Sequence, residues 1–225
     1  MDFQGTTGWR QWRGGDGGLQ QTQGQKEGWT SRKGGLEVWG RHEAQWAGEV
    51  GTEGSGDATM VEGPGCTRNG QKVRASLIGK SVAGVAGSAS LSVANSIRGR
   101  TLIACLTLGK ELWLIFSGDP AESAIRCHFG MNGSLHCNTQ PEHAGALTLL
   151  IQWNGGDQLR LFQATAVPAD AQKARHAVHA SSNRDVCSAA FDEAAGVAAL
   201  AAAPGDRIVS DALLDQSVLP GTGNP

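Results

Sequence analysis

The stretch TLIACLTLGKELWLIF, residues 101–116, decides the fold class. Its two apolar, β-type runs are joined at Leu108-Gly109-Lys110, and a glycine between two such runs is typical of a β-hairpin. Three similar runs follow downstream: AIRCHF, LTLLIQW and QLRLFQAT. The last two flank Asn154-Gly155-Gly156-Asp157, a second turn-like join. The sequence therefore predicts an antiparallel β-unit built from hairpins.

A short amphipathic helix is expected before this unit, in TRNGQKVRASLI, from Thr67 to Ile78. At helical spacing Val73, Leu77 and Ile78 fall on one face, and the basic side chains fall elsewhere. A stretch of small residues up to Ser96 then leads into the first strand-like run.

Helix-forming sequence dominates from Ala169 onward and includes an Ala-rich run at 194–203. In the following segment DRIVSDALLDQSVL, four residues are expected to form an apolar stripe on one helix: Ile208, Leu213, Leu214 and Val218. Pro220 and Gly221 are expected to end that helix. The overall expectation is an α+β chain, with a β-unit followed by helices.

The first 59 residues have a different composition, because they hold 15 of the 33 glycines and five of the seven tryptophans. Gly-rich sequence without an apolar period cannot offset its ordering entropy, so disorder is expected here. One alternative is a Trp/Arg arm, in WRQWR at 9–13, that stacks on single-stranded nucleic acid. The favoured interpretation is a translated leader, because the composition changes abruptly at Met60.

Charge and cysteine content limit the functional classes. The net charge is −2, and 6 of the 19 basic and 8 of the 21 acidic residues precede Met60, which leaves 13 of each after it. Such a balance gives no general electrostatic attraction to nucleic acid, so any DNA affinity must come from local placement. The five cysteines form no CxxC pair, which favours reduced thiols in an intracellular protein. No apolar run reaches the ~18 residues of a membrane span, and no membrane partner is expected.

Three short motifs carry a resemblance to a known family: MVEGPG at 60–65, LGKEL at 108–112 followed by HFGMNG at 128–133, and LLDQSVLPGTGN at 213–224. In this order they resemble the formamidopyrimidine-DNA glycosylase and endonuclease VIII family, with the valine and the GPG typical of a vertebrate endonuclease VIII-like branch. The resemblance spans residues 60–225 and is poorest between Ser81 and Arg100.

The resemblance implies a specific domain organisation. Residues 60–166 would form a two-layered antiparallel β-sandwich with a flanking helix. Residues 167–225 would begin a helix-two-turn-helix DNA-binding domain that stops before its second helix and before the zinc finger. No metal site and no cofactor are therefore expected in this chain, since the family's structural zinc would be bound by the missing part. A truncated transcript or gene model is the expected reason.

The resemblance also implies a catalytic group at Val61, Glu62 and Lys110. An α-amine has a pKa of about 8 against about 10.4 for lysine, so an N-terminal Val61 would be partly neutral and nucleophilic at physiological pH. Inside a longer chain its nitrogen would be an unreactive amide. Glu62 would serve as acid/base and Lys110 would hold a phosphate and assist the sugar chemistry. Each also has a plain alternative: a turn valine, a surface glutamate and a hairpin-tip lysine.

Two further residues are implied to bind DNA. Met131 would enter the base stack when the damaged nucleotide flips out, and Asn224 would hold the backbone beside the lesion. The alternatives are a core methionine and a simple helix cap. A zinc site across two strands, from Cys127-His128 and His136-Cys137, is a minor alternative for the motif around Met131.

The functional expectation is a nuclear, monomeric base-excision glycosylase for oxidised bases, with β-elimination lyase activity on damaged single-stranded or forked DNA. The alternative is an inactive truncated isoform or a non-enzymatic DNA-binding remnant. A general β-domain interaction protein is a third, more distant possibility, because it leaves the ordered motifs unexplained.

Overall fold

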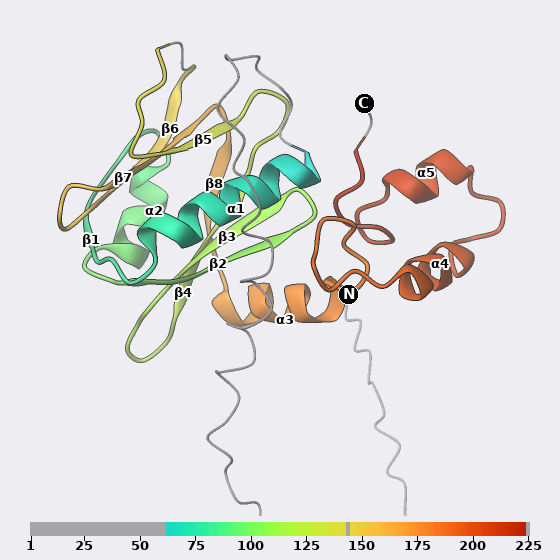
Figure 1. Cartoon of the computed structure of the whole chain (residues 1–225). Helices are drawn as coiled ribbons and strands as arrows, with labels where there is room; N and C mark the ends of the chain where they lie inside the picture. Colours follow the sequence, from blue (N-terminus) through green and yellow to red (C-terminus); the bar gives the residue numbers. More distant parts are fainter. Residues whose placement is uncertain (1–61, 143–144, 224–225) are drawn as a thin grey trace, which may run out of the picture. The chain divides into compact units, whose positions relative to one another are not determined.

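A computed structural model describes residues 62–142 and 145–223 of the chain (Figure 1). Its elements, in chain order, are α1 (Gly63–Leu77), β1 (Val82–Ala86), α2 (Ser90–Ile97), β2 (Leu102–Leu108), β3 (Glu111–Phe116), β4 (Ser123–His128), β5 (Ser134–Cys137), β6 (Leu147–Trp153), β7 (Gln158–Phe162), β8 (Thr165–Ala169), α3 (Ala171–Ser181), α4 (Glu193–Ala201) and α5 (Val209–Leu214). No helix in the described ranges is long and apolar enough to cross a bilayer.

The strands form two four-stranded antiparallel sheets, with orders β1-β6-β7-β5 and β2-β3-β4-β8. Both predicted hairpins are confirmed: β2 pairs with β3 around Gly109, and β6 pairs with β7 around Gly155 and Gly156. The expected α+β class and the two-layered sandwich are therefore confirmed.

The main core includes residues from both sheets together with α1 and α2, and a second cluster lies between β3, β4 and α3. Strand β3 contributes to both clusters, and Leu112 to Phe116 are all buried. A strand covered on both faces has no polar side, which explains why ELWLIF shows no alternation.

The amino-terminal helix differs from its prediction in both bounds. It begins at Gly63 instead of Thr67, with Glu62 as its N-cap residue and Pro64 in the first turn. Proline suits that position because its missing amide hydrogen has no intrahelical acceptor there. Val73 and Leu77 are buried as expected, whereas Ile78 follows the helix and is partly exposed. Its placement on the buried face was wrong because the helix ends at Leu77.

Three elements inside the sandwich were not predicted. Strand β1 and helix α2 occupy the stretch of small residues before Ser96, and the short β5 follows the Met131 loop. The run QLRLFQAT contains β7 and only the first residue of β8, and these two strands belong to different sheets. The break falls at Gln163, where φ is 45°, a left-handed conformation that interrupts a strand.

The predicted long carboxy-terminal helix was also wrong. Helix α5 ends at Leu214, because the Asp215 side chain accepts the Ser217 amide at 2.8 Å and its carbonyl accepts the Val218 and Leu219 amides. Asp and Ser commonly form such local turns in place of helix. Val218 therefore lies outside the helix. Ile208, the N-cap residue of α5, is exposed, as are Leu213 and Leu214.

Candidate functional site

Two of the predicted catalytic residues lie side by side. Glu62 caps α1 and Lys110 forms the tip of the β2–β3 hairpin, 48 residues later in the chain. Lys110 Nζ lies 3.5 Å from Glu62 Oε1, and both side chains are about one quarter exposed. This ion pair is therefore half-buried yet reachable by solvent. Lys110 lies at a hairpin tip, as its plain alternative expects, but it is paired with Glu62 and both side chains are mostly buried.

Three glycines allow the backbones around this pair to approach closely. They are Gly63 in α1, Gly109 at the hairpin tip and Gly221 in the loop after α5. A methyl on Gly63 would lie 2.4 Å from the Gly221 carbonyl oxygen, and a methyl on Gly109 would lie 2.8 Å from the Gly221 nitrogen. Gly109 and Gly221 also have φ values of 57° and 92°, which favour glycine. We call this meeting point the three-glycine junction.

The loop after α5 is held in place by Gln216. Its side-chain nitrogen donates to the Thr222 carbonyl at 2.9 Å, and its oxygen accepts the Gly221 amide at 3.0 Å. A methyl on Gly223 would overlap the Glu62 carboxylate, so this loop passes directly against the predicted acid/base. Gly221 and Gly223 thus have a structural reason to lack side chains.

Asp185 is the buried acidic residue of the junction, only 3% exposed. Its Oδ2 accepts the Gly109 amide at 2.8 Å and its Oδ1 accepts the Cys187 amide at 2.9 Å. Burial raises the pKa of this carboxyl, and the two backbone hydrogen bonds oppose that rise. Sequence reasoning missed Asp185, because an aspartate after a helix usually indicates only a local turn.

The predicted Met131 occupies an exposed turn between β4 and β5. Its side chain is 71% exposed, which excludes the alternative of a core methionine. The turn is closed by a hydrogen bond from the Gly133 amide to the carbonyl of the buried Phe129. Since Glu111 pairs with His128 across β3 and β4, Lys110 and this turn emerge at the same end of the ladder.

Glu111 links β3 to β4 beside the Met131 turn. Its carboxylate accepts two hydrogen bonds from the Arg126 guanidinium, at 2.8 and 2.9 Å, and His128 Nδ1 lies 3.0 Å from the same group. The bidentate contact raises the pKa of Arg126. The zinc alternative fails, because Cys127 and His128 lie in one sheet and His136 and Cys137 in the other. Within the described residues no group of three His, Cys, Asp or Glu could hold a metal.

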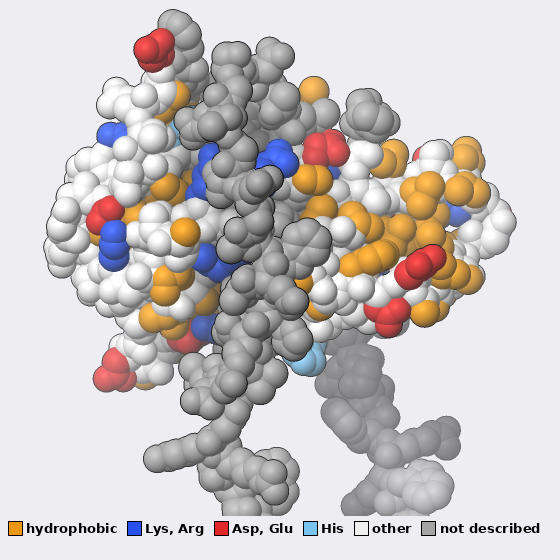
Figure 2. Space-filling model, in the orientation of Figure 1, with side chains coloured by type: hydrophobic (Ala, Val, Ile, Leu, Met, Phe, Trp, Pro, Cys, Tyr) orange, Lys and Arg blue, Asp and Glu red, His pale blue; other side chains and the backbone are white. Residues whose placement is uncertain are grey.

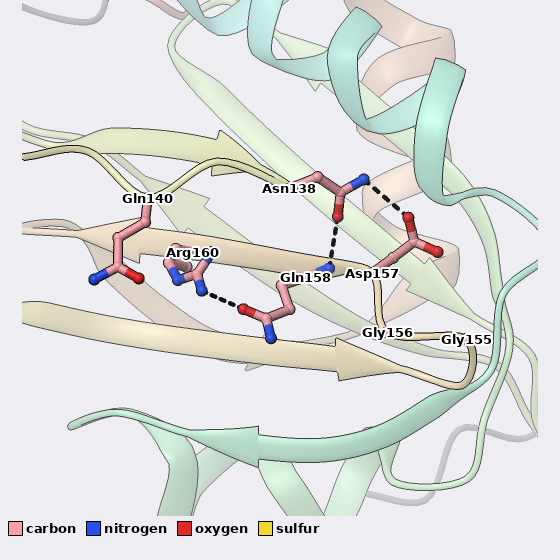
Figure 3. Close-up of a pocket in the computed structure, with 7 residues that line it drawn as sticks. All are labelled: Asn138, Gln140, Gly155, Gly156, Asp157, Gln158 and Arg160. Atoms are coloured by element: carbon pink, nitrogen blue, oxygen red, sulfur yellow. Dashed lines mark hydrogen bonds between the residues drawn. The ribbon is translucent and has the colours of Figure 1, made fainter.

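A polar pocket of about 480 Å³ lies elsewhere, at the β6–β7 turn (Figure 3). Its side chains mainly bind one another: Asn138 donates to Asp157 and accepts the Gln158 amide, and Arg160 donates to the Gln158 side chain. None of its lining residues belongs to the three-glycine junction. Val61 and Asn224, both predicted site residues, lie outside the described residues, as do residues 1–59.

Known proteins resemble this chain in sequence and in fold. Residues 60–165 match the formamidopyrimidine-DNA glycosylase N-terminal domain. The mouse protein Endonuclease 8-like 3 is 32% identical over 198 residues, covering 73% of this chain, and its human counterpart is 30% identical over 197. The chain spans about a third of the length of these curated relatives, 32% in both cases.

Solved structures show the same fold. The crystal structure of a viral DNA glycosylase superposes with a TM-score of 0.63 at 18% identity, covering 73% of this chain and 67% of that one. MutM in complex with DNA containing carbocyclic 8-oxo-G superposes with a TM-score of 0.54 at 17% identity, covering 72% and 64%. With its matched domain, its two sheets and its similarity to Endonuclease 8-like 3, the segment at residues 60–165 is a formamidopyrimidine-DNA glycosylase N-terminal domain.

Proposed function

We propose that the protein is a base-excision DNA glycosylase for oxidised bases, with an associated lyase activity at abasic sites. The observation that carries the proposal is the 3.5 Å contact between Glu62 and Lys110. Glu62 directly follows Val61, so an α-amine on Val61 would stand next to a carboxylate and a lysine. The proposal requires a mature chain that begins at Val61.

The chemistry follows from these three groups. The neutral amine of Val61 attacks the deoxyribose C1′, the glycosidic bond breaks, and the damaged base leaves with its bonding electrons and takes up a proton. Glu62 accepts the proton that the attacking amine loses and donates it to the ring oxygen as the ring opens, giving an iminium between Val61 and C1′. Loss of a C2′ proton then expels the 3′ phosphate by β-elimination. Lys110 holds the negative charge of the strand during these steps.

DNA binding is proposed to depend on local contacts. Where the described residues of the sandwich are in view, Figure 2 shows Lys and Arg side chains among apolar and polar ones. Met131 is exposed enough to fill the space of a flipped nucleotide, which offsets a few kcal/mol of unstacking. Asn224, which follows Gly223 in the sequence, would hold the DNA backbone. Single-stranded or forked DNA, a monomer and a nuclear location complete the proposal.

The test is base excision from single-stranded DNA that carries a hydantoin lesion. Protein starting at Val61 is expected to release the base and nick the strand, whereas the chain starting at Met1 is expected to do neither. Glu62→Gln tests the acid/base role, and Lys80→Ala is a matched control, since Lys80 forms another half-buried ion pair, with Asp157, outside the site. Equal activity from both starting points would contradict the assignment of Val61.

The second candidate is a non-enzymatic DNA-binding form. It is favoured by the 59 residues before Met60. If they are retained, the Val61 nitrogen is part of a peptide bond and is not nucleophilic. Mass spectrometry of the natural amino terminus separates the two candidates. A terminus at Val61 supports the enzyme, and one at Met1 or Asp2 supports the non-enzymatic form.

A further inference from the structure

Asp185 is an unusual residue for its environment. Its carboxylate is almost fully buried, and no Lys or Arg within the described part of the chain forms an ion pair with it. Burial of an unpaired carboxylate is costly unless hydrogen bonds compensate. The compensation comes from two backbone amides, those of Gly109 and Cys187.

The arrangement requires a carboxylate. Each of its two oxygens meets a different N–H donor, Oδ2 from the hairpin tip and Oδ1 from the turn that contains Asp185 itself. Asparagine has one acceptor oxygen, so its NH₂ group would face one of those donors. A local turn alone would accept asparagine, because such turns need only one acceptor.

The same turn also holds the loop after α5. The Val186 amide donates to the Pro220 carbonyl at 3.1 Å, and Gly221 packs against Asp185 Oδ1 and Cys187 Sγ. Residues 185–187 therefore contact the hairpin tip on one side and the loop against Glu62 on the other. Gly109, which Asp185 binds directly, is the residue before Lys110.

We propose that Asp185 is a positioning residue that fixes the β2–β3 hairpin tip so that Lys110 meets Glu62. Asp185 acts through the Gly109 amide and does not touch the reacting atoms. This inference rests on the proposed function for its catalytic consequence, whereas its structural consequence is independent of activity. It adds a fourth residue, from the segment between α3 and α4, to the group of Val61, Glu62 and Lys110.

The structural consequence is tested by competitive acetylation of the full chain, with Lys110 measured relative to Lys80 by mass spectrometry. Asp185→Asn is expected to raise the relative rate about two- to fivefold, which corresponds to the loss of one half-exposed ion pair. Asp192→Asn is the matched control, because Asp192 accepts the Ala194 and Ala195 amides at the start of α4, away from the hairpin. An unchanged Lys110 rate in Asp185→Asn, or an equal rise in the control, would overturn the proposal.

The catalytic consequence is tested by a double-mutant cycle on the rate of borohydride-trapped adduct formation, with protein starting at Val61. Asp185→Asn is expected to slow trapping about tenfold in the wild-type background, as for loss of one hydrogen bond to a charged group. In a Lys110→Ala background, Asp185→Asn should slow trapping by less than about twofold, because Asp185 acts on the reaction through Lys110. Equal slowing in both backgrounds would show a merely structural role and overturn the proposal.

The two failures are distinguishable. If the otherwise unaltered protein starting at Val61 forms no adduct, the proposed function fails, and the acetylation ratio still decides whether Asp185 positions Lys110. If the adduct forms but the Lys110 acetylation rate is unchanged in Asp185→Asn, the positioning proposal fails while the glycosylase proposal stands.

Discussion

Gly63→Ala is the substitution whose effect follows most directly from the three-glycine junction. The added methyl would lie 2.4 Å from the Gly221 carbonyl oxygen and 2.8 Å from Cys187 Sγ. Ordinary carbon contacts are about 3.5 to 4.0 Å, so relief requires a shift of about 1 Å. Because the nearer atom is backbone, the whole loop at Gly221 must move away from α1. Alanine before Pro64 is also disfavoured in helical conformation.

The net magnitude is the difference of two effects. Alanine in place of glycine stabilises a compatible helical site by about 0.5–1 kcal/mol. Overpacking costs about 1–3 kcal/mol, and this position has no free space to absorb the methyl. Because alanine before Pro64 is disfavoured in helical conformation, little of that gain applies, and we expect the free energy of unfolding to fall by about 1–2 kcal/mol.

Gly196→Ala is the matched control with the opposite expected sign. Gly196 lies inside α4, and its added methyl would make ordinary contacts of 3.4 Å to Phe191 and 3.5 Å to Leu219. It should gain about 0.5–1 kcal/mol. Urea unfolding of both variants, followed by circular dichroism, measures the difference. If Gly63→Ala is as stable as the wild-type protein, or both variants shift together, the close approach of α1 and the Gly221 loop is refuted.

Three further predictions follow from single side chains. Lys110→Ala should slow adduct formation at least about 100-fold in single-turnover trapping, yet change the free energy of unfolding by less than about 1 kcal/mol; a large loss of stability with intact trapping would contradict its role. Met131→Ala should leave stability within about 0.5 kcal/mol but weaken binding to lesion-containing DNA in fluorescence anisotropy, and unchanged binding would count against the wedge role. Hydrogen bonds from Ser217 and the ion pair with Arg207 lower the pKa of Asp215 to about 2. The ionised carboxylate therefore stabilises the fold above the unfolded pKa of 3.8, and this stability is lost as the pH falls from about 4 to 2. Asp215→Asn should flatten that part of the pH profile in urea unfolding, and an unchanged slope would contradict the assignment.

Local sequence signals predicted the hairpins well because their causes are local. Gly109 and the Gly155-Gly156 pair permit the tight turns, and the flanking residues suit a half-buried or fully buried strand. By contrast, VAGVA in β1 and SLSVANSI in α2 consist largely of small residues with no clear period. Their structure depends on pairing with β6 and on the Val93 and Ile97 contacts with the main core, which no local pattern reveals.

The site residues likewise differ in how well local sequence predicted them. Glu62 and Lys110 were predicted as partners through short motifs, and the structure brings them together. Asp185 was missed, because its partner amide lies 76 residues away in sequence and backbone amides carry no residue signature. The end of α5 was misjudged because a turn around Asp215 competes with helix, and apolar spacing alone does not register that competition.

The most direct test of the central claim is the location of the covalent bond to DNA. Protein starting at Val61 is incubated with abasic single-stranded DNA and borohydride, digested, and the modified peptide is identified by mass spectrometry. The account predicts a sugar adduct on the α-amine of Val61, formed slowly in Glu62→Gln and Lys110→Ala. An adduct on a lysine side chain, an adduct that persists when the amino terminus is blocked, or no adduct at all would contradict it.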